Sequence, residues 1–128
     1  MLRYALIFVL SLAAPSASAE EVLLGTYRTL ISSTDMVSSK GVPLTDPAAM
    51  IQQDRANYHR YNLRDAVDAD DGWFADPAKR AKIPQLIANG GGVPEYVADV
   101  MINFGAVLSV SIYASEGRLS SIRMEITG

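Results

Sequence analysis

The stretch from Asn57 to Phe74, NYHRYNLRDAVDADDGWF, contains the side chains best suited to chemistry. It holds the only histidine of the chain, His59, the only tryptophan, Trp73, and four aspartates. Histidine is the one side chain whose ordinary pKa lies near neutrality, so any general acid or base would be His59. We interpret His59 as a surface or half-buried side chain that bonds to the following loop, because the sequence shows neither an orienting acid nor an activated nucleophile beside it.

An enzyme is the alternative that this stretch leaves open. It would be a small cell-envelope hydrolase in which His59 works with an aspartate of residues 65–71. Serines and aspartates are plentiful, but no Gly-x-Ser-x-Gly elbow follows a predicted strand. The chain has no cysteine, which excludes a cysteine nucleophile and thiolate ligands, and a single histidine excludes a metal site of several imidazoles. The balance favours a protein without catalytic machinery, cofactor or bound metal.

The four aspartates of residues 65–71, followed by Gly72, suggest a second alternative, a calcium-stabilised structural protein. Carboxylate oxygens along a loop with a glycine turn are ligands that calcium prefers. With Asp68 and Asp70 at the first and third positions of an EF-hand, Gly72 falls at the fifth and Lys79 stands where a bidentate glutamate is required. The spacing therefore fails the EF-hand rule, and a solvated acidic turn is the simpler interpretation.

Three arginines, Arg55, Arg60 and Arg64, precede these aspartates on a predicted helix. Guanidinium groups on one helix face can clamp a carboxylate or a phosphate. Arg60 and Arg64 are four residues apart and share a face, whereas Arg55 lies off it. We interpret the set mainly as a solvated helix face paired with the aspartates. The candidate ligand-binding residues of the whole stretch are Arg55, His59, Arg60, Arg64, Asp68, Asp70 and Trp73.

Trp73 and Phe74 come just before Asp76, the expected cap of the next helix. Two adjacent large aromatics before a helix cap predict an anchor for the loop, with one ring directed inward. If Trp73 were exposed beside Tyr58 or Tyr61, these rings would instead offer a platform for carbohydrate or peptide.

The elements that position these residues begin with a strand at Val22–Ile31, which is rich in branched and aromatic residues. A capping aspartate followed by proline predicts a helix from Pro47 to about Tyr61. The same signal starts a second helix at Pro77, which Pro84 shortens or kinks. A third helix opens at Pro94 and is predicted to pack on the core through an apolar stripe formed by Val93, Tyr96, Val97, Val100, Met101 and Phe104.

The period changes from helical to alternating after Gly105, which predicts an antiparallel hairpin with one wet face. We therefore predict an α+β domain, in which a small antiparallel sheet of the N-terminal strand and the C-terminal hairpin is covered on one face by about three helices. The wet face is a weaker candidate surface for a protein or glycan strand, lined by Arg28, Ser109, Ser111, Tyr113, Arg123 and Glu125.

Residues 1–19 have the pattern of a secretory signal peptide. Arg3 precedes an apolar run from Tyr4 to Ala14, and small residues suited to cleavage end at Ala19. The run is shorter than the about 20 residues that cross a bilayer, and no later segment is suitable. We expect one domain of residues 20–128, with no transmembrane segment, in the periplasm or, alternatively, outside the cell.

Charge narrows the class of partner. Without Arg3, 10 basic residues remain against 14 acidic ones, a net charge of −4. An acidic surface argues against nucleic acid and anionic membranes as partners. We predict a small exported binding or protein-interaction domain whose partner is a protein or another component of the cell envelope.

Overall fold

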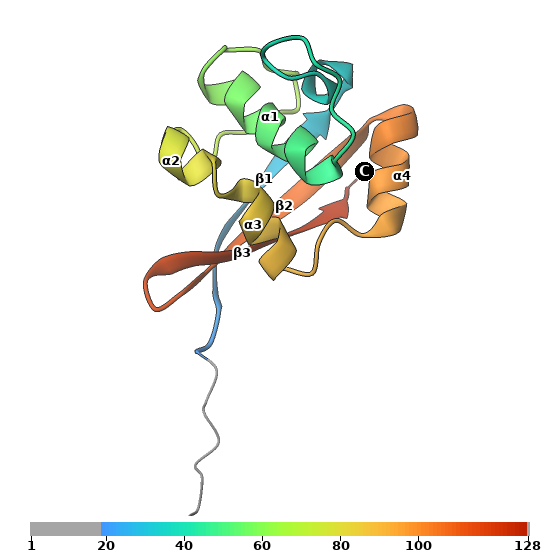
Figure 1. Cartoon of the computed structure of the whole chain (residues 1–128). Helices are drawn as coiled ribbons and strands as arrows, with labels where there is room; N and C mark the ends of the chain where they lie inside the picture. Colours follow the sequence, from blue (N-terminus) through green and yellow to red (C-terminus); the bar gives the residue numbers. More distant parts are fainter. Residues whose placement is uncertain (1–18, 128) are drawn as a thin grey trace, which may run out of the picture.

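A three-stranded antiparallel sheet carries helices on one face, which is the predicted α+β architecture (Figure 1). The computed structural model describes residues 19–127, so nearly all of the predicted signal peptide lies outside the described residues. The strands are β1 (Val22–Ile31), β2 (Ala106–Ser115) and β3 (Arg118–Ile126). The helices are α1 (Pro47–His59), α2 (Pro77–Arg80), α3 (Ile83–Asn89) and α4 (Glu95–Phe104), with a short 3-10 helix η1 (Ser33–Met36).

The sheet has the order β1-β2-β3, so the hairpin strand β2 is central and the N-terminal strand pairs with it. This confirms that the first strand joins the hairpin as a third strand. Along β2 the even-numbered residues from 106 to 114 are buried and the odd-numbered ones are half-exposed. The predicted alternation therefore places one apolar face against the helices and leaves the other face wet.

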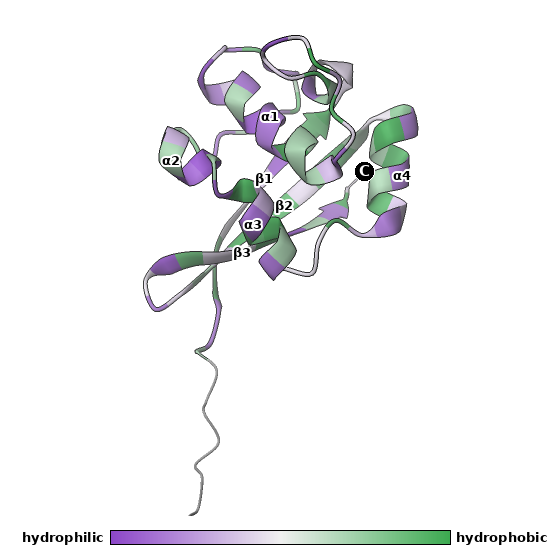
Figure 2. Cartoon of the chain, in the orientation of Figure 1, coloured by the Kyte–Doolittle hydropathy of each residue, from purple (hydrophilic) through white to green (hydrophobic). Residues whose placement is uncertain are grey.

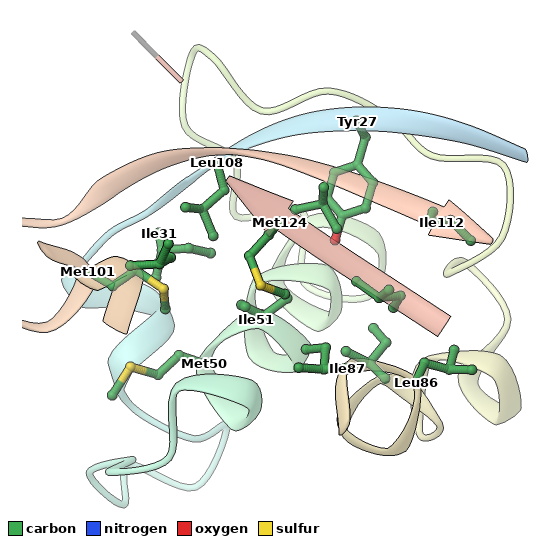
Figure 3. Close-up of a cluster of buried hydrophobic side chains, with 14 of the residues drawn as sticks. Tyr27, Ile31, Met50, Ile51, Leu86, Ile87, Met101, Leu108, Ile112 and Met124 are labelled. Carbon is green, nitrogen blue, oxygen red and sulfur yellow. The ribbon is translucent and has the colours of Figure 1, made fainter. Parts of the chain in front are cut away.

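The core lies between that apolar face and the helices (Figure 3). Ile51 of α1, Ile87 of α3 and Met101 of α4 are buried against the strands. Phe74, from the loop before α2, is also fully buried, which confirms the predicted inward ring of the aromatic pair. Figure 2 shows that hydrophobic residues recur along the sheet, and that α1 and α4 both carry hydrophobic and strongly hydrophilic residues.

The helices differ from the prediction in number and in one contact surface. Pro84 lies in the first turn of a separate helix, α3, where proline is tolerated. Residues 19–127 therefore contain four α-helices, whereas three were predicted. In α4, Val97 and Met101 are buried as predicted, but Tyr96 and Phe104 are exposed. Phe104 is the last residue of α4, next to the turn into β2, and 86% of its surface is open. The predicted stripe is thus only partly buried.

The close contact between α3 and β3 depends on Gly90, which directly follows α3. A Cβ at this position would lie 2.1 Å from the carbonyl oxygen of Ile122 in β3, so backbone would have to move. We expect Gly90→Ala to lower the free energy of unfolding by about 2 kcal/mol or more, as overpacking does, measured by chemical denaturation. Gly72→Ala is the control, because a Cβ there meets nothing within 4 Å. Equal effects of both substitutions would contradict this account.

Candidate functional site

Arg55 lies at the centre of the candidate region, and 0% of its side chain is exposed. Its Nε donates to Asp54 at 2.8 Å. One terminal nitrogen donates to Asp71 at 2.9 Å and to the carbonyl of Ala69 at 3.0 Å, and the other donates to the hydroxyl of Thr29 at 3.1 Å. Arg55 therefore joins α1, β1 and the 65–74 loop. Its interpretation as part of a solvated helix face is wrong, because acceptors on all sides allow the guanidinium to be buried.

Two tyrosine rings complete the surroundings of this guanidinium. Its central carbon lies 4.2 Å from the ring centre of Tyr27 in β1 and 4.6 Å from that of Tyr58 in α1. Arg64 also lies over Tyr58, at 3.9 Å, and its Nε donates to the Tyr58 carbonyl. Cation–π contacts of a desolvated guanidinium are worth about 2 kcal/mol. The rings therefore stabilise the charge of a side chain that is buried from solvent.

The loop aspartates accept hydrogen bonds from the protein itself. Asp68 accepts from the backbone N–H groups of Leu30 and Asp65 and from the hydroxyl of Thr29. Asp65 lies within 3.2 Å of the Ser32 hydroxyl, from which it accepts a hydrogen bond. These carboxylates have separate partners and tie the loop to β1, whereas Asp70 stays exposed and accepts from the next backbone N–H.

His59 is half-buried, and its Nε2 lies 2.7 Å from Oδ2 of Asp71. This confirms the prediction of a histidine bonded to the following loop. The orienting acid that the sequence did not reveal is Asp71, the same residue that pairs with Arg55. His59 does not line the hollow of about 420 Å³ or the groove of about 610 Å³ that the surface carries.

The same place also has the composition of a metal-ion site, because ligand atoms of His59, Asp70 and Asp71 lie within 4.8 Å of one another. However, one oxygen of Asp71 accepts from Arg55 and bonds to His59, while the other accepts the backbone N–H groups of Trp73 and of the residue after it. A cation would have to compete with a buried guanidinium. The geometry therefore fits a structural cluster better than a metal centre.

The guanidinium of Arg55 pairs with the carboxylates of Asp54 and Asp71, and the pKa values of these two carboxylates shift in opposite directions. Burial raises the pKa of Asp54 to about 7, more than the attraction of Arg55 lowers it. Burial would also raise the pKa of Asp71, but hydrogen bonds from His59, from two backbone N–H groups and from Arg55 lower it below its usual range. Asp71 is thus the ionised partner of Arg55 at neutral pH, whereas Asp54 gains or loses its proton near pH 7.

A groove of about 610 Å³ lies near Trp73, at the end of the sheet where the β2–β3 hairpin and the start of β1 extend beyond the helices (Figure 1). Trp73 lies so close to Gly25 that a Cβ there would meet its ring at 2.8 Å. Three exposed cations stand among the apolar walls, and the lining includes no acidic residue. The groove is lined by Leu24, Trp73, Lys79, Lys82, Ala114, Gly117, Arg118 and Leu119.

Of the predicted candidates, only Trp73 belongs to this groove. Sequence reasoning missed Lys79, Lys82 and Arg118, because α2 and the start of β3 are far apart in the chain and share no pattern. The residue type of Trp73 was the one available signal. Arg60 is exposed elsewhere, with its guanidinium 5.2 Å from the ring centre of Tyr61.

The other hollows have different characters. Tyr61 lines one of about 420 Å³ together with hydroxyl, amide and apolar side chains, and Trp73 does not belong to it. Tyr58 is buried, so neither tyrosine forms the conditional platform with Trp73. The wet face of the sheet has a shallow hollow of about 180 Å³, lined by Ser109, Ser111, Tyr113, Arg123, Met124 and Glu125. There Arg123 already pairs with Glu21 at 3.0 Å.

Comparison with protein-family models, with curated proteins and with solved structures gave no match to this chain. In residues 19–127, no helix has both the length and the apolar character needed to cross a bilayer.

The shifted pKa of Asp54 predicts how stability depends on pH. The folded protein keeps this proton up to about pH 7, whereas the unfolded chain releases it near the ordinary value of 3.8. Between these values unfolding releases a proton, so the free energy of unfolding falls as the pH rises and becomes flat above about 7. We expect wild type to lose more than about 1 kcal/mol between about pH 5 and about pH 8, and Asp54→Asn to lose much less.

Urea denaturation at each pH measures this difference. His59→Gln is the control, because His59 is bonded to Asp71 in the same cluster and is the only histidine of the chain; this variant should keep the Asp54-dependent slope. A slope that disappears in His59→Gln but persists in Asp54→Asn would contradict the assignment.

Proposed function

We propose that this protein is a small exported interaction domain that binds an acidic peptide segment of a partner in the groove beside Trp73. The observation that carries the proposal is the groove itself. It combines an indole and two leucines with three cations, in a chain whose overall charge is negative.

The size and the lining of the groove suit a ligand. Its volume of about 610 Å³ falls within the usual range for binding sites. Tryptophan is enriched among the residues that dominate binding energy, and Trp73 forms part of the wall. Leu24 and Leu119 extend the apolar surface. A peptide side chain could therefore bury apolar area here.

Charge indicates which peptide the groove would bind. Lys79, Lys82 and Arg118 are exposed, and none of them forms an ion pair within residues 19–127. Three unpaired cations next to an apolar wall attract carboxylates and steer their approach. An acidic segment with apolar side chains complements both features.

The polar cluster supports binding over the alternative of a hydrolase. The guanidinium of Arg55 is sealed from solvent, and His59 is hydrogen-bonded to Asp71, the counter-ion of that guanidinium. The nearby hydroxyl of Thr29 lies 2.7 Å from a carboxyl oxygen of Asp54 and 3.0 Å from one of Asp68, so it is held as part of the fold. The aspartates of the loop have internal partners as well, which gives no support to calcium-dependent stabilisation.

Export is part of the proposal because residues 1–19 have the signal-peptide pattern. Residues 20–128 contain no cysteine, so the domain requires no disulfide in the compartment to which it is exported. The periplasm is the proposed location, and a partner would be a protein of that compartment or of the envelope.

The test is selection of peptides from a random display library on the immobilised 20–128 domain. Recovered peptides should be enriched in Asp and Glu, and Trp73, the only tryptophan, should report their binding by fluorescence. We expect the double substitution Lys79→Glu with Lys82→Glu to lower the affinity for a recovered acidic peptide by about tenfold or more.

The matched control carries the same change of net charge on exposed residues outside the groove, Lys40→Glu with Arg60→Glu. It should alter the affinity by no more than about twofold. Equal loss in both variants, or failure to recover any acidic peptide, would overturn the proposal.

A further inference from the structure

The two edges of the sheet are covered to different extents. At the outer edge of β3, the side-chain amide of Asn89 donates to the carbonyl of Ser120, and Gly90 lies against the carbonyl of Ile122. The end of α3 therefore closes that edge around residues 120–122. A partner strand has no access to β3 at this point.

The edge of β1 is covered only in its C-terminal half. The backbone N–H of Ala69 donates to the carbonyl of Arg28, and the N–H of Leu30 donates to Asp68. Both bonds are at 2.8 Å, so the 65–74 loop substitutes for a neighbouring strand there. These bonds also show that the backbone groups of Arg28 and Leu30 point away from β2.

The N-terminal half of the same edge has no such cover. Outward-pointing groups recur every second residue in an antiparallel pair, so Thr26 directs its N–H and C=O to the same side as Arg28. Within residues 19–127, no backbone hydrogen bond from outside the sheet reaches Thr26. The strand start is also apolar and exposed, with open fractions of 61% at Val22, 53% at Leu23 and 44% at Leu24. A bulge between Leu23 and Gly25 interrupts the regular pairing of β1 with β2 there, so the outward N–H and C=O of Thr26 are the regular groups of this half with which a neighbouring strand can pair.

We propose that the acidic segment binds as an added strand along residues 22–26 of β1. This inference rests on the proposed function and specifies its binding mode. Leu24 belongs both to this edge strand and to the lining of the groove, so the free edge and the groove meet at this residue. Backbone bonds to Thr26 would supply affinity, and alternate side chains of the added strand would face Trp73 and the cations.

Charge selects a partner segment over a second copy of this chain. The residues at the start of β1 in a second copy are also acidic and apolar, but Glu21 already accepts from Ser121 and Arg123 in its own protein. A partner with free carboxylates can satisfy Lys79, Lys82 and Arg118 without breaking those bonds. Self-association is therefore an outcome that the test must distinguish.

The test compares Thr26→Pro with Thr26→Ala. Proline removes an outward N–H that the β1–β2 ladder does not use, and proline is tolerated at such edge positions. Alanine keeps this N–H and loses only the contact of the Thr26 hydroxyl with Ser111, at 3.2 Å. The probe is the strongest acidic peptide recovered from the display library. We expect Thr26→Pro to lower the affinity for this peptide by about tenfold or more, and Thr26→Ala to lower it by no more than about twofold. Circular dichroism should show that both variants are folded.

A second measurement leaves the protein unchanged. The same peptide with N-methyl groups on alternate amides cannot donate to an edge strand, and one of its two alternate patterns should bind at least about tenfold more weakly. This keeps the inference testable if Thr26→Pro does not fold.

The outcomes separate the two proposals. If Thr26→Pro and both N-methyl peptides bind as well as their controls, while the Lys79 and Lys82 reversal still weakens binding, strand addition is overturned and the groove stands. If no acidic peptide is recovered, both proposals fall. If the wild-type domain sediments as a dimer that Thr26→Pro dissociates, a second copy occupies the edge and the strand-addition proposal is overturned.

Discussion

A guanidinium with no exposed surface has to meet an acceptor or an aromatic ring on every side, and this requirement connects the main parts of the molecule. Arg55 comes from α1, but its partners Thr29, Ala69 and Asp71 come from β1 and from the 65–74 loop. Removing one member of a buried ion pair typically costs about 3–5 kcal/mol, because it leaves the other charge uncompensated. The loop therefore cannot detach from β1 without exposing a charge to solvent or leaving a charge buried and unpaired.

The fixed loop shapes the proposed binding surface in two ways. Asp68 and Ala69 cover the C-terminal half of the β1 edge, which confines strand pairing to residues 22–26. Further along the loop, Asp71 accepts the backbone N–H of Trp73 and so holds the indole against Gly25. A surface that is rigid before binding loses less conformational entropy when a ligand arrives. In the proposed function, the charged cluster would serve binding indirectly, by positioning residues that it does not itself contain.

The sequence predicted the elements well because local signals decide them. Asp46 and Asp76 cap their helices as expected, accepting from the backbone N–H two residues on, and the alternation along β2 set its buried face. The burial of Arg55 could not be predicted, since charged side chains are normally exposed and its partner Asp71 is distant in the chain. The groove was equally hidden, because Lys79 and Arg118 meet only through the tertiary fold.

The central claim is that the Arg55–Asp71 pair holds the loop on β1, and a double-mutant cycle tests it most directly. Arg55→Met and Asp71→Asn, singly and together, would be unfolded in urea and followed by far-UV circular dichroism. Asparagine keeps an acceptor for the backbone N–H groups, so the cycle isolates the charge pairing. The account predicts a coupling free energy of about 2 kcal/mol or more, with the double variant less destabilised than the sum of the single ones. A coupling below about 0.5 kcal/mol would contradict it.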